Sequence, residues 1–349
     1  MWADLPEVPV LYVRAVLAFI LLVCCVTPLH AGFPARALGS VRGQPFERFE
    51  TTDEFDRRVL FYLSEPVVDV ELPLVVWIQG SGYGSVFQSF GDRVRGVTGH
   101  SSVQRASEGL ARVLLVEKVG TPYLAKPTPR GGAIDAPEVF RREHTLPRWS
   151  AAVEAAIRAS WTLPGVDDSR TMVIGHSEGG VAASRVAARM EEVSHVGVLA
   201  GEGPTQLYSL IRLARSGSFD LSGSPDEREQ WVLDGWRRVL ADPHSADEMF
   251  FGHPHRRWST FCVAGPVHEL RGSNAAVFIA QGLEDLAVEP TSAEVLYAEL
   301  LSTGRRVELF RVEHADRSFN VWQGEELVSS ELERVAERAL SFFLEAPFP

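Results

Sequence analysis

Cysteine and concentrated positive charge are both scarce in this sequence. Only 3 of its 349 residues are cysteine, and 34 lysines and arginines stand against 46 aspartates and glutamates, which gives a net charge of −12. No long basic run is present. Binding to nucleic acid or to an anionic membrane surface draws on concentrated positive charge, so the sequence predicts neither as a partner.

Long apolar runs are scarce as well, and the clearest one lies near the N-terminus. Residues 15–26 are uninterrupted apolar residues, with Arg14 directly before them. A membrane-spanning helix needs about 20 apolar residues, so this shorter run is more typical of a signal peptide. We predict a signal peptide at residues 1–31, cleavage after Ala31, and a periplasmic or secreted protein without a stable membrane span. An uncleaved N-terminal anchor is the alternative.

The mature chain that this prediction leaves contains one cysteine, Cys262. A single cysteine cannot form an internal disulfide bond, and the 45% of hydrophobic residues supply enough apolar surface for a core without one. Cys262 lies in the apolar segment WSTFCVAG. We therefore interpret it as a buried, unreactive thiol rather than as a nucleophile.

Short apolar runs rich in β-branched residues alternate with helical patterns along the chain. Apolar strands separated by helices are typical of a sheet that is covered on both faces. The sequence therefore predicts an α/β fold with a doubly wound, mostly parallel sheet. The predicted strands are 58–64, 72–79, 112–117, 171–175, 195–200, 275–280 and 306–312, and the main predicted helices are 148–161, 178–191 and 328–344.

The alternation stops between Gly201 and Gly272, after the fifth predicted strand, where about seventy residues contain no clear strand. Ser-Pro-Asp-Glu at 224–227 is a capping box with proline at the first helical position. We predict a helical cap at 203–272, inserted into a core formed by 32–202 and 273–349. The apolar face of its main helix is predicted to contain Val232, Trp236, Val239 and Leu240.

One short motif indicates chemistry. Gly175-His176-Ser177-Glu178-Gly179 matches G-x-S-x-G between a predicted strand and a predicted helix. A serine at that position lies on a tight turn with its hydroxyl above the sheet, and side chains at the flanking glycines would collide across the turn. The first amides of the helix point to where negative charge develops during nucleophilic attack. Ser177 is therefore the predicted nucleophile.

A serine hydroxyl is a weak nucleophile and needs a general base. Asp285, in QGLED, follows the predicted strand 275–280, and His314, in EHADRSF, follows the strand 306–312. These segments and their chain order resemble the acid turn and histidine loop of the α/β-hydrolase superfamily. The resemblance implies the fold of that superfamily and an acyl-enzyme mechanism in which His314 takes the proton of Ser177 while Asp285 orients His314.

Other residues could take these roles. Glu202, in AGEGP, stands where some members of the superfamily place the acid, whereas Glu284 is expected to face solvent. His176, beside the nucleophile, is expected to point into the fold. His253 and His255 form a His-Pro-His segment without a third ligand nearby, so we predict no metal site and no cofactor.

The resemblance also implies an oxyanion hole made of two backbone amides. One belongs to Glu178, which follows the nucleophile. The other is expected in the segment 79–82, which reads Gln-Gly-Ser-Gly where the superfamily usually has His-Gly, and Ser81 is the predicted donor. The pair Glu117 and Lys118 follows a predicted strand near the same site, and we interpret it as structural.

Together these features predict an exported serine hydrolase that cleaves a carboxylic ester of a small molecule. A serine peptidase or amidase acting on short peptides is one alternative, and a non-catalytic binding protein on the same fold is another. The cap is rich in aromatic residues, which favours an apolar acyl or alcohol group in the substrate. Trp231, Trp236 and Trp258 are the residues expected either to wall the substrate pocket or to form the core of the cap.

Overall fold

The structure, a computed structural model, describes residues 34–345. The predicted signal peptide at 1–31 and its cleavage site lie outside the described residues. Within 34–345, none of the helices combines the length and the apolar character that crossing a membrane requires.

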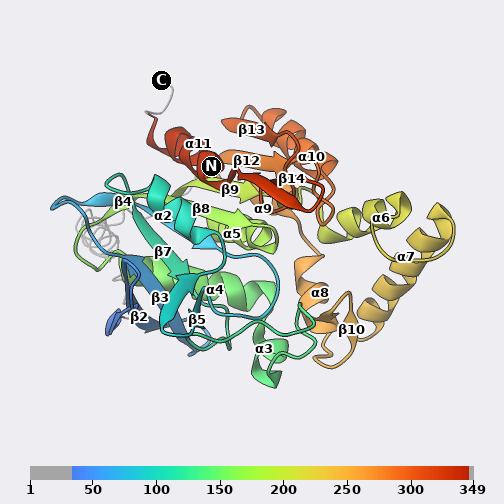
Figure 1. The fold of residues 1–349 in the computed structure, drawn as a ribbon, viewed down its shortest axis with the longest axis horizontal. Helices are drawn as coiled ribbons and strands as arrows, with labels where there is room; N and C mark the ends of the chain where they lie inside the picture. Colours follow the sequence, from blue (N-terminus) through green and yellow to red (C-terminus); the bar gives the residue numbers. More distant parts are fainter. Residues whose placement is uncertain (1–33, 346–349) are drawn as a thin grey trace, which may run out of the picture. The chain divides into compact units, whose positions relative to one another are not determined.

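Nine strands of the described chain form one central sheet (Figure 1). Every neighbouring pair from β7 to β13 is parallel, whereas β1, β2 and β3 form an antiparallel edge. The prediction of a mostly parallel sheet is confirmed. In their order across the sheet the strands are β1 (Arg36–Ser40), β2 (Phe46–Thr52), β3 (Arg58–Ser64), β7 (Arg112–Val116), β4 (Leu72–Ile78), β8 (Val166–His176), β9 (Val193–Leu199), β12 (Ala276–Gly282) and β13 (Val307–Val312).

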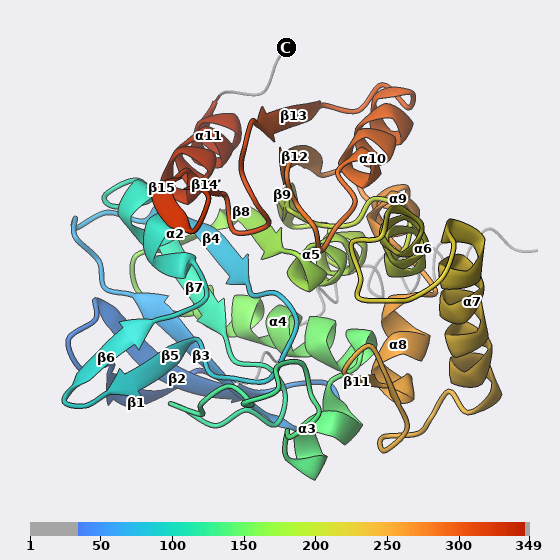
Figure 2. The same ribbon diagram turned by 45° about the vertical axis from the view of Figure 1, so that its right-hand side comes forward.

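Helices pack on both faces of this sheet (Figures 1 and 2). The helices are α2 (His100–Ala106), α3 (Glu138–Glu143), α4 (Leu146–Ser160), α5 (Glu178–Arg189), α6 (Gln206–Ser216), α7 (Pro225–Ala241), α8 (His255–Phe261), α9 (Pro266–Leu270), α10 (Thr291–Leu301) and α11 (Leu332–Leu344). Three small antiparallel pairs complete the described chain: β5 (Phe87–Phe90) with β6 (Arg93–Gly96), β10 (Met249–Phe250) with β11 (His253–Pro254), and β14 (Asn320–Gln323) with β15 (Glu326–Ser330).

The alternation of side chains along β4 explains the two layers of core. Leu74, Val76 and Ile78 belong to one buried cluster, with side chains of α4 and α5. Val75 and Trp77 point to the opposite face and belong to a second cluster, with side chains of α2 and α11. Successive side chains of a strand face opposite sides of a sheet, so a fully apolar strand requires cover on both.

The predicted strands and helices match the observed elements to within a few residues, with one clear exception. The closing helix was predicted at 328–344, but it begins at Leu332. Residues before it form β15, which pairs with β14 through contacts such as Trp322 with Leu327. The apolar residues Leu327 and Val328 are exposed in this hairpin, so their hydrophobicity does not extend the buried face of the helix.

The segment between β9 and β12 contains α6, α7, α8 and α9. Much of it has its own apolar cluster, which includes Val232, Val239 and Phe250. The capping box of α7 is present: the Ser224 hydroxyl accepts from the backbone of Glu227, whose carboxylate accepts from the backbone of Ser224. The expectation for Leu240 is wrong, because its side chain is 56% exposed. Leu270 of α9 packs in the cluster of the main core.

Candidate active site

Ser177 lies between the end of β8 and the start of α5, in a turn that glycines make possible. Its φ of 56° is in the left-handed region, which residues other than glycine rarely adopt. A Cβ on Gly175 would lie 2.0 Å from the carbonyl oxygen of Gly179, and a Cβ on Gly179 would lie 2.3 Å from that of Ile78. Side chains therefore do not fit at Gly175 and Gly179 in this turn, as the motif predicted.

Ser177 is buried in the wall of a cavity of 220 Å³. The cavity lies between the core and the segment that was predicted as a cap. Its lining comes from the loops that follow β4, β8, β9, β12 and β13, together with α6, the segment after α6, α8 and the turn before α8. Ser81 and Glu178, the predicted oxyanion residues, both lie in this lining.

Arg317, which the sequence reasoning did not consider, is the side chain in contact with the nucleophile. Its Nη2 lies 2.6 Å from Ser177 Oγ, to which it donates, and 3.5 Å from Ser81 Oγ. A guanidinium remains protonated at neutral pH, so Arg317 cannot accept the serine proton. The signal that could have identified Arg317 is its charge, three positions after His314 in the segment expected to face the serine.

His314 lies elsewhere in the same loop. Its backbone φ is 58°, its side chain is 74% exposed, and its Nδ1 is 3.1 Å from Oε1 of Glu284. Within residues 34–345, neither Ser177 nor Asp285 has a hydrogen bond to His314. The structure thus does not bring the three predicted triad residues together, because the loop turns His314 toward the surface and places Arg317 at the serine. The role of His314 as base stays a prediction.

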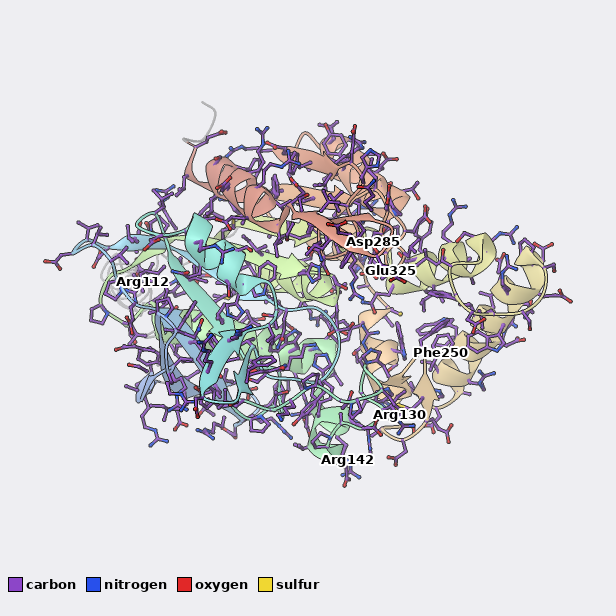
Figure 3. The ribbon with its side chains drawn as sticks, viewed as in Figure 1. Arg112, Arg130, Arg142, Phe250, Asp285 and Glu325 are labelled. Carbon is purple, nitrogen blue, oxygen red and sulfur yellow. The ribbon has the colours of Figure 1, made fainter. Side chains whose placement is uncertain are left out.

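Asp285 is held firmly after β12, at the edge of the core near α6 (Figure 3). Its Oδ1 accepts from the backbone amides of Ala287 and Val288 at 2.7 and 2.9 Å, and its Oδ2 accepts from Nε2 of Gln281 at 3.1 Å. Burial raises the pKa of this carboxyl, while those hydrogen bonds and the charge of Arg317 act in the opposite direction. Asp285 therefore has a fixed position, but no imidazole among the described residues forms a hydrogen bond with it.

Glu202, the alternative acid, is a second carboxyl in the lining of the cavity. It is 6% exposed, and its Oε2 has no hydrogen-bond partner among residues 34–345. Burial raises the pKa of Glu202 to about 7, although the charges of Arg257 and Arg317 oppose the shift. A carboxyl with this pKa changes its protonation state near neutral pH, which Asp and Glu side chains in water do not.

The carboxylate of Glu178, one residue after the nucleophile, is the centre of a buried ionic cluster. It accepts from Nε and Nη2 of Arg257 at 2.8 and 2.5 Å and from Nε2 of His144 at 2.8 Å, and Lys118 Nζ lies 3.3 Å away. Burial alone would raise the pKa of Glu178, but these charges hold it well below its usual value. The cluster therefore links the serine turn to α8.

Lys118 extends the same cluster to the predicted oxyanion loop. Its Nζ donates to the carbonyl oxygens of Gly80 at 2.5 Å and Gly82 at 2.9 Å. These carbonyls flank Ser81, the predicted second amide donor. The interpretation of Glu117 and Lys118 as structural fits this arrangement, since both side chains are buried in hydrogen-bond networks.

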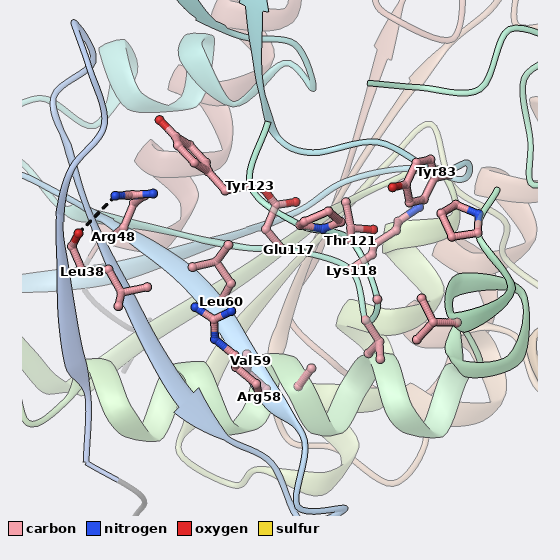
Figure 4. A pocket seen from close by; sticks show the side chains of 16 residues that line it. Leu38, Arg48, Arg58, Val59, Leu60, Tyr83, Glu117, Lys118, Thr121 and Tyr123 are labelled. Carbon is pink, nitrogen blue, oxygen red and sulfur yellow. Dashed lines mark hydrogen bonds between the residues drawn. The ribbon is translucent and has the colours of Figure 1, made fainter. Parts of the chain in front are cut away.

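Glu117 and Lys118 also border a larger cavity, of 670 Å³, that does not contain Ser177 (Figure 4). The carboxylate of Glu117 accepts from the hydroxyl of Tyr62 at 2.6 Å, from the hydroxyl of Ser85 and from the amide of Val86 at 3.2 Å. Burial raises the pKa of Glu117 to about 7. Because these donors already occupy its carboxylate, Glu117 is a structural group.

His176 and Cys262 have structural surroundings. His176 stacks on Trp77, and its Nε2 lies 2.9 Å from the carbonyl oxygen of Arg317, which agrees with its expected inward direction. Cys262 is buried, and burial raises the pKa of its thiol to about 12, as expected for an unreactive cysteine. In the described part of the chain, no three His, Cys, Asp or Glu side chains are grouped as ligands for a metal ion.

The three tryptophans of the predicted cap differ in position. Trp258 lines the cavity and also belongs to the apolar cluster of this segment. Trp231 is 44% exposed and packs against Phe250 and Phe251, and Trp236 is half-buried against the same cluster. Trp258 is thus the tryptophan of the three that contacts the Ser177 cavity.

No family model matches this sequence, and no curated protein sequence matches it. Solved structures do match. Est1E from Butyrivibrio proteoclasticus has a TM-score of 0.51 and 16% identity over 89% of this chain and 98% of its own. Carboxyl esterase 2 from Tuber melanosporum has a TM-score of 0.53 and 16% identity over 87% of this chain and 90% of its own. Acylaminoacyl peptidase from Pyrococcus horikoshii has a TM-score of 0.54 and 13% identity over 84% of this chain but only 40% of its own.

These matches, the strand order and the serine turn define the class of fold: this chain has the α/β-hydrolase fold. The expectation drawn from the GHSEG motif and the two later segments is confirmed at the level of the fold. With identities of 13–16%, the activities of those esterases and peptidases remain properties of those proteins.

Proposed function

We propose that this chain is a serine hydrolase that cleaves carboxylic esters, with Ser177 as the nucleophile. The observation that carries the proposal is the backbone of Ser177, a residue other than glycine at φ 56° in the wall of a cavity. A residue in such a conformation costs of order 1–3 kcal/mol, and such strain is found mainly at functional sites. Glycine would relieve the strain, so the serine hydroxyl itself accounts for the choice of residue.

In the proposed reaction, Ser177 Oγ forms a bond to the acyl carbon of the ester while its proton passes to a general base. The backbone amides of Glu178 and Ser81 and the N-terminus of α5 stabilise the oxyanion. The carbon–oxygen bond to the alcohol then breaks, and the alcohol leaves with the proton from the base. Water attacks the acyl-enzyme in the same way, which releases the acid and restores Ser177.

The proposed base is His314, oriented by Asp285. In the described conformation Arg317 donates to Ser177 Oγ, and His314 pairs with Glu284. Hydrolysis through His314 therefore requires the loop after β13 to rearrange, so that Arg317 leaves the serine and His314 replaces it. Loop movements of this kind complete the catalytic groups of many enzymes.

A second candidate function is that of a non-catalytic binding protein, and one observation favours it. The group at Ser177 Oγ is a guanidinium that cannot act as a base, and the histidine of this loop is exposed. A fold that hosts hydrolases also hosts proteins without catalysis. In that case Ser177 and Arg317 would serve as ligand contacts in the same cavity.

A fluorophosphonate probe separates the two functions, because it labels activated serine nucleophiles covalently. For a serine hydrolase we expect labelling of Ser177 and turnover in a panel of p-nitrophenyl esters. Ser177→Ala should abolish labelling and lower turnover on the order of 10³-fold or more. Well-folded protein that neither reacts with the probe nor cleaves any ester would establish the binding protein.

The same panel extended to aminoacyl-p-nitroanilides tests the choice of ester over peptide bond, since both reactions use the same groups. Faster cleavage of the anilides than of the esters would make this chain a serine peptidase. His314→Ala belongs in both panels as the test of the base. If activity persists in that variant at the wild-type level, His314 is not the base.

We also propose that the chain is exported, on the basis of the apolar run at 15–26 and Arg14 before it. Expression in a bacterial host followed by fractionation and N-terminal sequencing tests this proposal. We expect a periplasmic or secreted product that begins after Ala31. A product in the cytoplasm with an intact Met1 contradicts export, and an uncleaved product in the membrane fraction supports the anchor instead.

A further inference from the structure

A second cavity, of 710 Å³, shares Ser81 and Arg317 with the Ser177 cavity. Burial lowers the pKa of His176, which also borders it, to about 4, so this imidazole is neutral at pH 7. Among the described residues that line the second cavity, Arg317 is therefore the single charged one. Besides Ser81, the other polar side chains of the lining are hydroxyls and amides: Gln79, Thr98, Ser102, Ser318, Asn320 and Ser330.

No acid among residues 34–345 forms an ion pair with Arg317. Asp316, its neighbour in the chain, accepts instead from two backbone amides at 2.7 and 2.9 Å and from the indole of Trp322 at 2.7 Å. Glu331, between two residues of the lining, accepts from Nε of Arg334 at 2.8 Å. The acids beside the second cavity are thus already occupied, and the charge of Arg317 is left without a counterion there.

Two further carboxyls respond to the charge of Arg317 from outside the second cavity. Burial raises the pKa of Glu202 and of Asp285, and the charge of Arg317 opposes both shifts. Neither residue borders the second cavity. Asp285 is also held by its own hydrogen bonds to two backbone amides and to Gln281. An acid of the protein therefore does not supply the missing counterion in the second cavity.

Two nitrogens of Arg317 are available to a ligand. Its Nη2 donates to Ser177 Oγ, whereas Nε and Nη1 have no hydrogen-bond partner among residues 34–345. The side chain is only half-buried, and neither nitrogen is among the atoms that the protein encloses. A guanidinium presents its N–H groups as a planar fork, which matches the two oxygens of a carboxylate. An accessible cation without a counterion at the edge of a cavity indicates a site for an anion.

The charge count limits the anion to one negative charge. One guanidinium balances one such charge, and the rest of the lining is neutral. A phosphate monoester carries about −1.5 to −2 near pH 7, which would leave negative charge uncompensated in a protein whose net charge is −12. A carboxylate fits the count, and the hydroxyl and amide side chains of the lining can donate to its remaining lone pairs.

We propose that the second cavity binds a free carboxylate of the ester substrate and that Arg317 pairs with it. This assignment rests on the proposed function, because the carboxylate is part of the ester that Ser177 cleaves. The substrate then carries its free carboxyl group on either the acid part or the alcohol part. The apolar group expected from the aromatic content of the cap belongs in the Ser177 cavity, whose lining includes Phe219, Phe251 and Trp258.

The same ion pair acts on the nucleophile. In the described conformation Arg317 donates to Ser177 Oγ, which is a neutral hydroxyl. Hydrogen bonds to an ionised partner are stronger than those to a neutral one, so a carboxylate competes with the serine for the guanidinium. Binding of the substrate therefore favours departure of Arg317 from Ser177, which hydrolysis through His314 requires.

Binding is tested with the full-length Ser177→Ala protein, in which the ester is not consumed. The probes are monobutyl adipate and the butyl ester of adipic acid monoamide, which have the same length but end in a carboxylate and a neutral amide. In calorimetric titration at pH 7 and low salt, we expect the carboxylate probe to bind about tenfold more tightly or better, as one hydrogen bond to a charged group would give.

A second pair of probes moves the carboxylate to the alcohol part of the ester. These are 4-butyryloxybutanoate and 4-butyryloxybutanamide. A preference for the carboxylate in the first pair assigns it to the acid part, and a preference in the second pair assigns it to the alcohol part. If neither pair shows a preference for the carboxylate, or if no probe binds, the proposal is wrong.

Arg317→Gln in the same protein identifies the group that binds the carboxylate. It should weaken the preferred carboxylate probe about tenfold or more and leave the matching amide probe nearly unchanged. Arg42→Gln is the control, because Arg42 is exposed, borders neither cavity and changes the net charge equally. A preference that disappears in both variants shows a general effect of charge, and one that persists in both shows another binding group; either result contradicts the proposal.

Wild-type kinetics on the same probes separates this proposal from the proposed function. We expect a higher kcat/KM for the carboxylate ester than for its amide, and Arg317→Gln should remove the preference by slowing the first and speeding the second. If wild type cleaves no probe while Ser177→Ala binds the carboxylate through Arg317, the proposed hydrolase fails and the anion site remains. Cleavage of carboxylate and amide probes alike, with equal binding, leaves the hydrolase and removes the anion site.

Discussion

Two loops of the same sheet edge meet at the Ser177 cavity, and they are held in place in different ways. The turn after β8 is fixed by backbone contacts, because side chains on Gly175 or Gly179 would overlap with main-chain oxygens. The loop after β13 has no such restriction at its functional residues. It turns at His314 and again at Phe319, both at φ 58°, and the contact of Arg317 with the serine is made by the end of a long side chain.

The difference teaches which kind of site residue a motif identifies with certainty. A turn that accepts only glycine at two positions can be identified from a motif of five adjacent residues. A loop in which different polar side chains could reach the same point cannot be identified from a short motif in this way. The predictions below test the rigid side and the adaptable side of the site in turn, beginning with the largest expected effect.

Asp285→Asn should lower kcat/KM for ester cleavage by up to about 10⁴-fold, because an amide favours the wrong tautomer of the neutral imidazole and does not stabilise the imidazolium that forms. Glu202→Gln should cost far less. Steady-state kinetics on one p-nitrophenyl ester compares the two variants directly. If the Glu202 variant loses more activity than the Asp285 variant, Glu202 is the acid of the site and the assignment is reversed.

Glu178→Gln tests the rigid side of the comparison. It removes the negative charge that Arg257 and Lys118 surround, and breaking a buried ion pair costs about 3–5 kcal/mol. We expect the free energy of unfolding in urea to fall by that amount. Glu284→Gln is the control, because its ion pair with His314 is exposed and should change stability by less than ~1 kcal/mol. A loss below ~1 kcal/mol in the Glu178 variant would show that the cluster does not stabilise the turn.

The pH dependence of stability distinguishes Glu202 from an ordinary carboxyl. Its pKa is about 7 in the folded protein against 4.5 for an unperturbed glutamate. The folded state therefore holds a proton that the unfolded state has lost, and stability falls as pH rises from about 4.5 to about 7. Relative to wild type, Glu202→Gln should gain roughly 3 kcal/mol of stability over this range, since one pKa unit is about 1.4 kcal/mol.

Urea unfolding of both proteins at several pH values from 4.5 to 8 measures this difference. Glu117, with a pKa of about 7 as well, contributes the same trend to both proteins and cancels in the comparison. A difference that stays constant with pH would mean that Glu202 is charged throughout, with a solvated or paired carboxylate.

Arg317→Met tests the adaptable side. A hydrogen bond from a charged donor contributes about 1.5–3 kcal/mol, and Arg317 makes one to Ser177 Oγ. If His314 must replace Arg317 for hydrolysis, removing this bond should raise kcat/KM about 10- to 100-fold. Arg317→His, which puts an imidazole into the loop near Ser177 and Asp285, should raise it as well. A loss of activity in Arg317→Met would instead place Arg317 in the reaction or in substrate binding.

A protein without catalysis gives a different pattern in these two variants. Arg317→Met then stays inactive, because no base is restored, whereas Arg317→His has a base and gains measurable hydrolysis. Comparing Arg317→Met with Arg317→His therefore distinguishes a resting loop conformation, in which both variants gain activity, from a site without a base, in which only Arg317→His does.

Much of the fold follows from local patterns in the sequence. The strands that became β4, β7, β9 and β12 and the second half of β8 are mainly apolar runs, and burial on both faces leaves such runs few alternatives. The antiparallel strands β1 and β2 were not predicted, because polar residues alternate in them and their exposed positions resemble those of loops. The closing helix was placed too early since exposed apolar residues of β15 precede it.

The sequence by itself determined the strand-to-helix turn at Ser177, the parallel core of the sheet and the burial of Cys262. Each of these depends on sterics or hydrophobicity over a few adjacent residues. Only the tertiary structure decided that Arg317 and not His314 lies at the serine, and that Glu178 is fully paired while Glu202 is not. Those outcomes depend on which charged side chains from distant segments reach one buried point, and electrostatic pairing of that kind leaves no periodic pattern in the sequence.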